Sequence, residues 1–547
     1  MEELDHRRKI MIMVAVMAAL LFAALNQTIV STALPTIIER LGGMEYYSWV
    51  FTVYMLTSSI TTILVGKLSD IYGRKPFILF GIGLFVIGSL LCGLSQTIMQ
   101  LIIYRGIQGL AGGMILSTAF TAIGDLFAPR ERGRWQGLMT GAFGLASVFG
   151  PTLGGYIVDH TDWHWVFWVF LPFGIVAFVM ILLMFPKVER KRGESIDYPG
   201  SLFLTLVMVP LLLAFSWAGT TYPWASVPIA GLFIGSAVAL ILFIVSESRA
   251  HSPVIPLQLF RDNIYTLSNV VSFLLGAGMF SAIMYMPWFI QGVMGTSATI
   301  SGYIVMPMTL SLVLGSAVGG QLMTRTGKYK MLALAGIVIM AVGMAMLSTM
   351  NTATTPFIAI VNMVITGLGL GLAMPVFTLT VQNTVEDRML GVATASSQLF
   401  RSLGGTIGVS VMSTVMAHRL SDKLLEAAPL LNPGTARDIP AEAEEAFALL
   451  QNPQSLLDPG KLEQAAQTLP AELQEIYMHS VTLLREALGY SLSGVFIAGA
   501  AVMVVAFALT LMLKEIPLRG ARSKGKPEAS SESNESGGTG RKPAGQH

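Results

Sequence analysis

The chain has 547 residues, of which 53% are hydrophobic and 12% are charged, and its formal net charge is +2. A soluble chain of this length carries about 25% charged residues, because water must wet its surface. The composition therefore excludes a soluble protein. The seven His and one Cys show no metal-ligand spacing, and the sequence has no Gly-x-x-x-x-Gly-Lys-Ser/Thr loop. We therefore expect no metal, no cofactor, no nucleic-acid partner, no enzymatic activity and no ATP-driven mechanism.

Apolar segments recur from one end of the chain to the other, each long enough for a membrane-spanning helix. Such a helix needs about 20 residues to cross about 30 Å of hydrocarbon. We expect an all-α polytopic membrane protein with 14 spans. The expected spans are 10–34, 48–67, 77–95, 99–123, 135–158, 164–185, 201–218, 226–246, 264–290, 300–323, 331–349, 356–380, 391–417 and 491–513. The first is too long to be the apolar region of a cleaved signal peptide.

Positive charge separates the connections between these spans into two sets. Alternate connections hold 19 Lys and Arg residues, whereas the short connections on the other side hold only Arg40. Because short cytoplasmic loops collect Lys and Arg, the first set is expected to be cytoplasmic. Both termini are then cytoplasmic, which requires an even number of spans. We expect a multi-pass protein of the plasma or inner membrane.

The connection between the last two spans, residues 419–490, holds five basic and 11 acidic residues. Long loops are translocated regardless of charge, so this segment can lie outside the cell. Helical periodicity over 441–450 and 471–488 predicts a small helical cap over the outer mouth, and a spacer without a role is an equal alternative. Residues 1–9 are expected to form a cytoplasmic N-terminus. The Gly/Ser-rich residues 514–547 are expected to form a disordered cytoplasmic tail.

An internal repeat divides the chain into two halves. At an offset of 254 residues, Gly66 matches Gly320 and Gly150 matches Gly404, and this register holds across four spans. The sequence predicts an N-terminal six-helix bundle, a linker with two inserted spans, and a C-terminal six-helix bundle that includes the long outer loop. Their boundaries are 10–186, 187–263 and 264–513. Parallel repeats of this kind hold a substrate site at their interface, and rocking of the halves gives alternating access.

Several segments carry a family resemblance. In Gly66–Lys75 (GKLSDIYGRK), glycines allow close helix approach, and Asp70 and Arg74 can pair. This segment resembles the signature loop of the major facilitator superfamily. Further matching segments are Leu101–Gly113, Ala146–Gly155, Leu25–Pro35 and Trp163–Pro172. The last two resemble the 14-span drug:proton antiporter branch in particular, which implies the fold of this family and multidrug efflux.

The resemblance also implies roles for individual residues. Asp70 would help to lock the cytoplasmic side, and Arg74 would pair with the acid at the inner end of the fourth span, here Asp125. Gly150 and Pro151 belong to an element that is typical of exporters rather than importers. Without the resemblance, the small residues of this fifth span indicate only close helix packing.

Two arginines, Arg105 and Arg401, lie inside predicted spans. A cation at the centre of a membrane helix costs roughly 2.5–3.5 kcal/mol or more, so both are expected to face a polar interior. Each has a glutamine within one helical turn, Gln108 and Gln398 respectively. The resemblance assigns Arg105 to proton coupling or substrate contact. A structural arginine bonded to carbonyl groups is the alternative at Arg105, and at Arg401 a functional role and the lack of one are equal alternatives.

The first span carries Asn26 where many members of the resembling branch have Asp. An amide cannot titrate, and no carboxylate falls at the middle of a predicted span. A proton carrier would then be an interfacial group, with Asp125, Asp70, or the outer Asp159 and His160 as the candidates. The cavity is expected to be neutral to positive, which favours neutral amphipaths or anions over cations. The residues expected to line it are Asn26, Gln27, Tyr54, Gln108, Trp288, Phe289, Gln398 and Arg401.

Together these features predict a secondary transporter that exports hydrophobic or amphipathic small molecules and confers resistance to some of them. Protons are the expected counter-ion, and a monomer embedded in lipid is the expected state. Two alternatives remain open. One is a specific exporter of an endogenous metabolite, including an anionic one. The other is a transporter-like sensor that binds a ligand without moving it.

Overall fold

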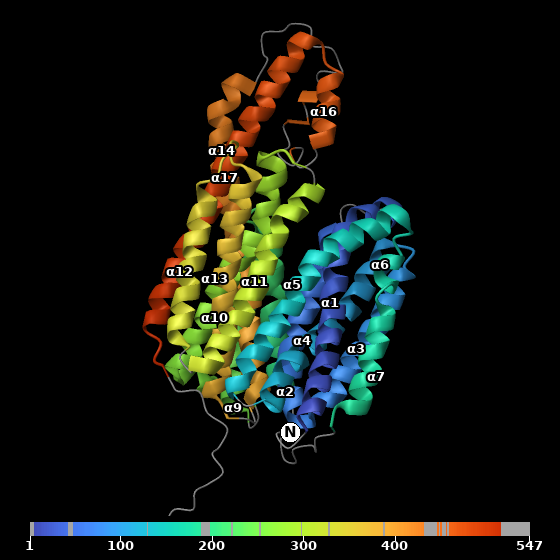
Figure 1. Cartoon of the computed structure of the whole chain (residues 1–547), viewed down its shortest axis with the longest axis vertical. Coiled ribbons are helices and arrows are strands. Elements are labelled where there is room, and N and C mark those ends of the chain that lie inside the picture. Colours follow the sequence, from blue (N-terminus) through green and yellow to red (C-terminus); the bar gives the residue numbers. More distant parts are fainter. Residues whose placement is uncertain are drawn as a thin grey trace, which may run out of the picture.

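The protein is helical almost throughout the part of the chain that the computed structural model describes (Figure 1). The described residues are 5–41, 47–127, 129–186, 197–219, 222–250, 253–296, 298–326, 329–386, 389–431, 446–447, 449–450, 456 and 459–515. Thirteen helices within these ranges are long and apolar enough to cross a membrane. The remaining predicted span is α2 (Tyr47–Tyr72), which packs along α4 (Ile98–Leu126) in the same bundle. A bilayer core offers no water to backbone groups, so helices are the form that such apolar segments must take. The predicted all-α polytopic fold is confirmed.

The N-terminal half contains α1, α2, α3, α4 and α5, followed by a sixth span made of α6 and α7. Bounds not yet given are α1 (His6–Leu41), α3 (Arg74–Gly93), α5 (Pro129–His160), α6 (Trp165–Trp168) and α7 (Leu171–Met184). Between α2 and α3 the chain turns at Gly73, whose φ of 87° suits a residue without Cβ. The Thr97 hydroxyl accepts a hydrogen bond from the Gln100 amide at 3.3 Å and caps the start of α4.

The C-terminal half repeats the packing of the N-terminal half. It contains α10 (Asn263–Trp288) with the π-helical turn η3 (Phe289–Val293), α11 (Ala298–Thr326), α12 (Lys330–Ser348), α13 (Pro356–Thr384), α14 (Leu390–Leu431) and α17 (Ala471–Leu511). In one half α1 packs on α5, while α2 and α3 pack on α4. In the other half α10 packs on α14, while α11 and α12 pack on α13. The two sets of pairs correspond helix by helix, as an internal repeat requires.

A helical hairpin lies between the halves in the sequence. It consists of α8 (Tyr198–Trp217) and α9 (Val227–Arg249), and the short 3-10 helix η2 (Leu257–Arg261) leads from it to α10. α8 packs against both α2 and α14, one helix from each half. α9 leaves large apolar side chains uncovered, with Val227 85% and Ile234 65% exposed. Such a surface suits contact with lipid tails.

The C-terminal part of α14 and the N-terminal part of α17 extend well beyond the spans predicted at 391–417 and 491–513. α14 has 42 residues and α17 has 41, and α16 (Pro459–Gln467) packs on α17. Figure 1 shows this helical extension above the C-terminal half. Its buried residues, including Leu462, Tyr477 and Leu488, belong to the same apolar cluster as Met344 in α12. Apolar packing therefore continues from the membrane helices into the extension, and much of the predicted segment 441–450 lies outside the described residues.

Candidate transport site and latch

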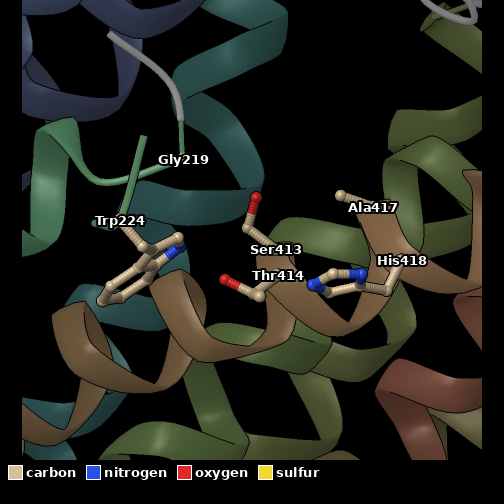
Figure 2. A pocket seen from close by; sticks show the side chains of 6 residues that line it. All are labelled: Gly219, Trp224, Ser413, Thr414, Ala417 and His418. Atoms are coloured by element: carbon tan, nitrogen blue, oxygen red, sulfur yellow. The ribbon is translucent and has the colours of Figure 1, made fainter. Parts of the chain in front are cut away.

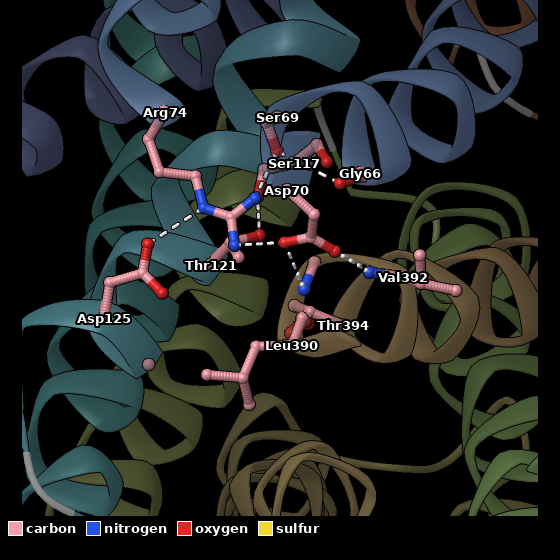
Figure 3. A network of polar contacts seen from close by, with 12 residues as sticks. Gly66, Ser69, Asp70, Arg74, Ser117, Thr121, Asp125, Leu390, Val392 and Thr394 are labelled. Atoms are coloured by element: carbon pink, nitrogen blue, oxygen red, sulfur yellow. Dashed lines mark hydrogen bonds and ion pairs between the residues drawn. The ribbon is translucent and has the colours of Figure 1, made fainter. Parts of the chain in front are cut away.

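Arg74 is the centre of a polar network at the end of the bundle where α2 meets α3 (Figure 3). The residue is 4% exposed, and its guanidinium lies between two carboxylates. Its Nε donates to Asp125 Oδ2 at 2.9 Å, Nη1 donates to Ser69 Oγ at 2.6 Å, and Nη2 pairs with Asp70 Oδ1. The predicted pairing of Arg74 with Asp70 and Asp125 is therefore present in the structure. We call Asp70, Arg74 and Asp125 the latch.

The latch also reaches the other half of the molecule. The backbone N–H groups of Gly391 and Val392 each donate to a carboxylate oxygen of Asp70 at 3.1 Å. These two residues lie in the first turn of α14, where unpaired amides and the helix dipole favour an anion. A carboxylate from the N-terminal half thus caps a helix of the C-terminal half. Its donors are backbone amides, which almost every residue has, so no pattern of side chains in the sequence predicts this contact.

Arg132 supports the latch from the start of α5. Its Nε donates to the Phe127 carbonyl at 2.9 Å and its Nη2 donates to the Gly124 carbonyl at 2.7 Å. Both carbonyls lie at the C-terminal end of α4, where a cation is favourable. Arg132 therefore fixes the end of the helix that carries Asp125. From the sequence, this arginine contributed only to the charge of a loop.

Glycines make a second contact between the halves, along α5 and α11. A Cβ on Gly137 would lie 2.5 Å from the Ser316 carbonyl oxygen, and one on Gly133 would lie 3.1 Å from the Gly320 carbonyl oxygen. The two backbones approach so closely that neither position has room for a side chain. Further along α5 the partner changes to α1, where a Cβ on Gly154 would lie 2.8 Å from the Ile29 carbonyl oxygen.

Gly150 and Thr28 continue this contact between α5 and α1. The Thr28 hydroxyl donates to the Ala146 carbonyl at 2.9 Å, and its side chain occupies the space beside Gly150. The side chain of Pro151 lies outside the described residues. The predicted close packing of the fifth span is present, on α11 at one end and on α1 at the other.

Arg105 is fully buried inside the N-terminal half. Its Nη1 donates to Gln108 Oε1 at 2.6 Å and lies 3.5 Å from Asn26 Oδ1, and its guanidinium carbon lies 4.4 Å from the centre of the Tyr54 ring. The amide of Gln108 donates to Asn26 Oδ1 at 2.9 Å and to Ser89 Oγ at 2.7 Å. We call these five residues the arginine cluster. Three of the expected lining residues therefore gather around one buried cation.

The arginine cluster is not fully satisfied. Within the described residues, Arg105 Nε and Nη2 and Asn26 Nδ2 have no hydrogen-bond partner. The two hydrogen-bond acceptors that Arg105 does have are amide oxygens, so its charge is solvated by dipoles rather than neutralised. Buried donors without partners cost free energy unless something occupies them, which is typical of a functional site. Ser89 gave no distinctive signal in the sequence, since a serine in an apolar span is common.

The other expected lining residues are distributed differently. Arg401 and Gln398 contact one another on α14, and Arg401 is partly exposed. Gln27 donates from α1 to Met55 Sδ at 3.6 Å on α2. Trp288 packs against the apolar cluster that contains Met344 and Leu462, and Phe289 is 1% exposed within that cluster. In this conformation Phe289 is a core residue rather than part of a polar cavity.

Comparisons with known proteins decide the family. The sequence model of the Major Facilitator Superfamily matches residues 16–409. The chain belongs to the major facilitator superfamily. It is 37% identical over 536 residues to the multidrug transporter protein MdtP of Bacillus subtilis, covering 96% of this chain and 97% of that protein. It is also 37% identical over 416 residues to multidrug resistance protein 3 of the same bacterium, covering 76% of this chain and 81% of that protein.

A solved structure shares the fold at low sequence similarity. The human organic anion transporter MFSD10 superposes with a TM-score of 0.60 and 14% identity, covering 92% of this chain and 99% of that chain. The predicted family, its fold and a multi-pass location in the cell membrane are therefore confirmed. The protein is a major facilitator transporter, and its relatives are transporters rather than enzymes.

Proposed function

We propose that this transporter exports hydrophobic and amphipathic small molecules, and that its two halves rock to expose the arginine cluster to each side in turn. The substrate class is supported by relatives at 37% identity that are named a multidrug transporter and a multidrug resistance protein. One observation carries the mechanism: Asp70 of the N-terminal half caps the first turn of α14 in the C-terminal half. A contact of this kind can form and break as a unit, as alternating access requires.

The latch end is assigned to the cytoplasm, because the positive connections lie on that side. The described conformation is then closed toward the cytoplasm. Protons are the proposed counter-ion, and the carboxylates of the latch are the groups proposed to bind them. Protonation of Asp70 would remove the anion from the N-terminus of α14 and one partner of Arg74. The latch would weaken when a proton binds and re-form when it leaves.

A second candidate is export of an anionic metabolite. It is favoured by the buried charge of Arg105, whose described acceptors are amide oxygens and which has two unpartnered nitrogens. A carboxylate or sulfonate entering the arginine cluster would provide the acceptors that these donors lack. This candidate differs from multidrug efflux in the range of compounds that it predicts, not in its mechanism.

The test is transport by the purified protein in proteoliposomes, with and without an imposed pH gradient. Three fluorescent probes separate the candidates: neutral N-phenyl-1-naphthylamine, anionic 8-anilinonaphthalene-1-sulfonate and cationic rhodamine 6G. We expect gradient-dependent movement of the neutral probe above that in protein-free liposomes. Movement of the anionic probe alone would favour the second candidate. Binding of the probes without movement or counterflow would overturn both and indicate a sensor.

A further inference from the structure

The helical hairpin α8–α9 covers a seam between the two halves. Met208 of α8 and Phe243 of α9 pack in one apolar cluster with Ile63 of α2 and Leu399 of α14. At the other end of α8, the ring of Trp217 lies 5.5 Å from that of Trp49 at the start of α2. The hairpin therefore forms a wall along the seam between α2 and α14, and it separates this seam from lipid.

A cavity of about 210 Å³ lies where this wall meets the outer part of α14 (Figure 2). Its lining residues are Gly219 and Trp224 from the turn between α8 and α9, and Ser413, Thr414, Ala417 and His418 from α14. These α14 residues follow the start of the helix by more than 20 positions, which is about 35 Å at 1.5 Å per residue. The cavity therefore lies about 35 Å along α14 from the latch, and the extension of α14 and α17 continues beyond it.

The turn of the hairpin holds Trp224 in place. Gly219 has a φ of 77°, and its N–H donates to the Tyr222 carbonyl at 2.8 Å, while the Tyr222 N–H donates to the Trp217 carbonyl at 3.1 Å. The ring of Trp224 packs edge-on against Phe215, with centroids 6.1 Å apart. Glycine at 219 satisfies two requirements, because it adopts the positive φ and leaves room for the indole, which a Cβ there would approach to 3.0 Å.

The lining chemistry indicates what the cavity accepts. The Trp224 indole nitrogen is buried and has no hydrogen-bond partner among the described residues. Figure 2 shows this nitrogen on the side of the ring that faces α14, with the Ser413 hydroxyl and the His418 imidazole across the cavity. No lining residue is a carboxylate. The next residue along α14, Arg419, lies over the Tyr490 ring at 4.1 Å, so the nearest formal charge on that helix is positive.

We propose that this cavity is an outer binding site for aromatic amphipaths that are neutral or anionic and carry a hydrogen-bond acceptor, with Trp224 as its donor and stacking surface. The inference rests on the proposed export function, and it assigns the inserted hairpin a part in it. A compound leaving the arginine cluster toward the outer side would be held between the hairpin and α14 before release. An aromatic ring can stack on the indole, and an acceptor can take its unpaired N–H.

Cysteine protection tests the site directly. Cys92 is the only cysteine of the chain and is buried, so the unmodified protein is the labelling blank. Ala417→Cys places a thiol at the rim of the cavity, and Leu425→Cys places one on the same helix outside it, at a residue that is 71% exposed. In lipid nanodiscs, saturating 8-anilinonaphthalene-1-sulfonate should slow alkylation of Ala417→Cys by N-ethylmaleimide at least about fivefold, a difference of about 1 kcal/mol. Alkylation of Leu425→Cys should not change.

Two further variants resolve the role of Trp224. Trp224→Phe keeps an aromatic ring and removes the N–H, and it should raise the probe concentration for half-protection about fivefold, again about 1 kcal/mol. Tyr222→Phe, in the same turn and outside the cavity, is the matched control and should leave that concentration unchanged. Thr414→Cys replaces Ala417→Cys if the latter does not fold. Equal protection inside and outside the cavity, or no protection at either thiol position, overturns the proposal.

The protection experiment is independent of transport. It measures binding without a gradient, so protection of Ala417→Cys in a protein that moves no probe would contradict the export function and leave the site standing. If the protein exported the probe but the probe did not protect Ala417→Cys, the outer site would be refuted and the export function would remain.

Discussion

The two halves meet along two seams with different chemistry. Between α2 and α14, Asp70 joins a buried ion pair to two amides of the opposite half. Between α5 and α11, glycines such as Gly133 and Gly137 bring two backbones together without a charge. A proton can neutralise a carboxylate, whereas a close fit of backbones has nothing to titrate. Under the proposed mechanism, the first seam is the one that a proton would release, and the second is the one along which the halves would slide or pivot.

The internal repeat makes this difference clearer. At the offset of 254 residues, Gly66 corresponds to Gly320, and both lie where the halves approach closely. The residue that corresponds to Asp70 is Thr324, which carries no charge. Close packing is thus shared by both repeats, while the acid occurs in one of them. In the proposed mechanism, the contact between α2 and α14 could therefore respond to a proton through Asp70, whereas the matching position of the C-terminal repeat has no such group.

The largest effect is expected from removing the cation of the latch. Arg74→Gln leaves Asp70 and Asp125 close together without their shared partner, and losing one member of a buried ion pair costs about 3–5 kcal/mol. The seam between α2 and α14 should open more often. Ala395 is 1% exposed and faces Gly66 across this seam, so Ala395→Cys reports the opening through its reaction with N-ethylmaleimide.

We expect the labelling rate of Ala395→Cys to rise at least tenfold in the Arg74→Gln background, which takes only about 1.4 kcal/mol. Labelling of the buried native Cys92 in Arg74→Gln without the added cysteine serves as the control for general unfolding. An unchanged rate at Ala395→Cys would mean that the ion pair does not hold this seam closed.

A smaller effect is expected at the glycine seam. A Cβ on Gly137 would meet the Ser316 carbonyl oxygen at 2.5 Å, and overpacking of this kind costs about 1–3 kcal/mol. Gly137→Ala should lower Tm and slow transport by the same factor at pH 6 and pH 8, because no titratable group is involved. Gly302→Ala, on α11 with nothing within 4 Å of its Cβ, should change neither. A pH-dependent defect in Gly137→Ala would break the distinction between the two seams.

A third variant adds a titratable group to the arginine cluster. Asn26→Asp places a carboxylate near Arg105, whose Nη1 lies 3.5 Å from the present Asn26 Oδ1. Proton dependence, or counterflow of rhodamine 6G, should increase about fivefold, which corresponds to about 1 kcal/mol. Gln27→Glu is the control, since this neighbour contacts Met55 instead. An unchanged transport profile in Asn26→Asp would remove Asn26 from the mechanism.

The smallest effect is expected from an exposed pair that joins Asp162, in the loop before α6, to His164 at the start of the next span. His164 Nδ1 lies 2.7 Å from Asp162 Oδ1, and this hydrogen bond holds the pKa of Asp162 below its usual range. A lowered pKa stabilises the folded state above the ordinary value for Asp, and that stabilisation is lost as the pH falls through the lowered value. Because exposed pairs contribute little, Asp162→Asn should shift Tm at pH 7 by no more than about 2 °C. The Tm of Arg74→Gln, measured in parallel, should fall much further. If Asp162→Asn lowered Tm by as much as Arg74→Gln does, burial would not be what makes the latch strong.

Much of this arrangement follows from sequence, because the bilayer restricts what an apolar segment can do. Length and hydropathy predict the spans, and the repeat predicts matching helix pairs in the two halves. The pairing of Arg74 with Asp125 followed from the family resemblance. The pairing of Arg105 with Gln108 followed from the rule that a membrane-embedded cation needs polar partners, whereas the contact of both with Asn26 was not predicted.

Other parts could not be predicted, for physical reasons. The cap that Asp70 makes on α14 uses backbone amides 321 and 322 positions away, which no side-chain pattern reports. The extension of α14 and α17 depends on apolar packing beyond the predicted spans, whereas a hydropathy window ends a span where polar residues begin. Phe289 is of a residue type that often lines ligand cavities, but its burial depends on neighbours in other helices.

The central claim is that the latch seam must open during each transport cycle, and a reversible cross-link tests it most directly. A Cβ on Gly124 of α4 would lie 3.3 Å from the Cδ1 atom of Leu390 on α14, so cysteines at these two positions face one another across the seam and are the pair chosen for oxidation to a disulfide between the halves. The account predicts that oxidised Gly124→Cys/Leu390→Cys stops transport of N-phenyl-1-naphthylamine in proteoliposomes, and that a reductant restores it. Transport that continues at the same rate across a fully formed cross-link would contradict the account.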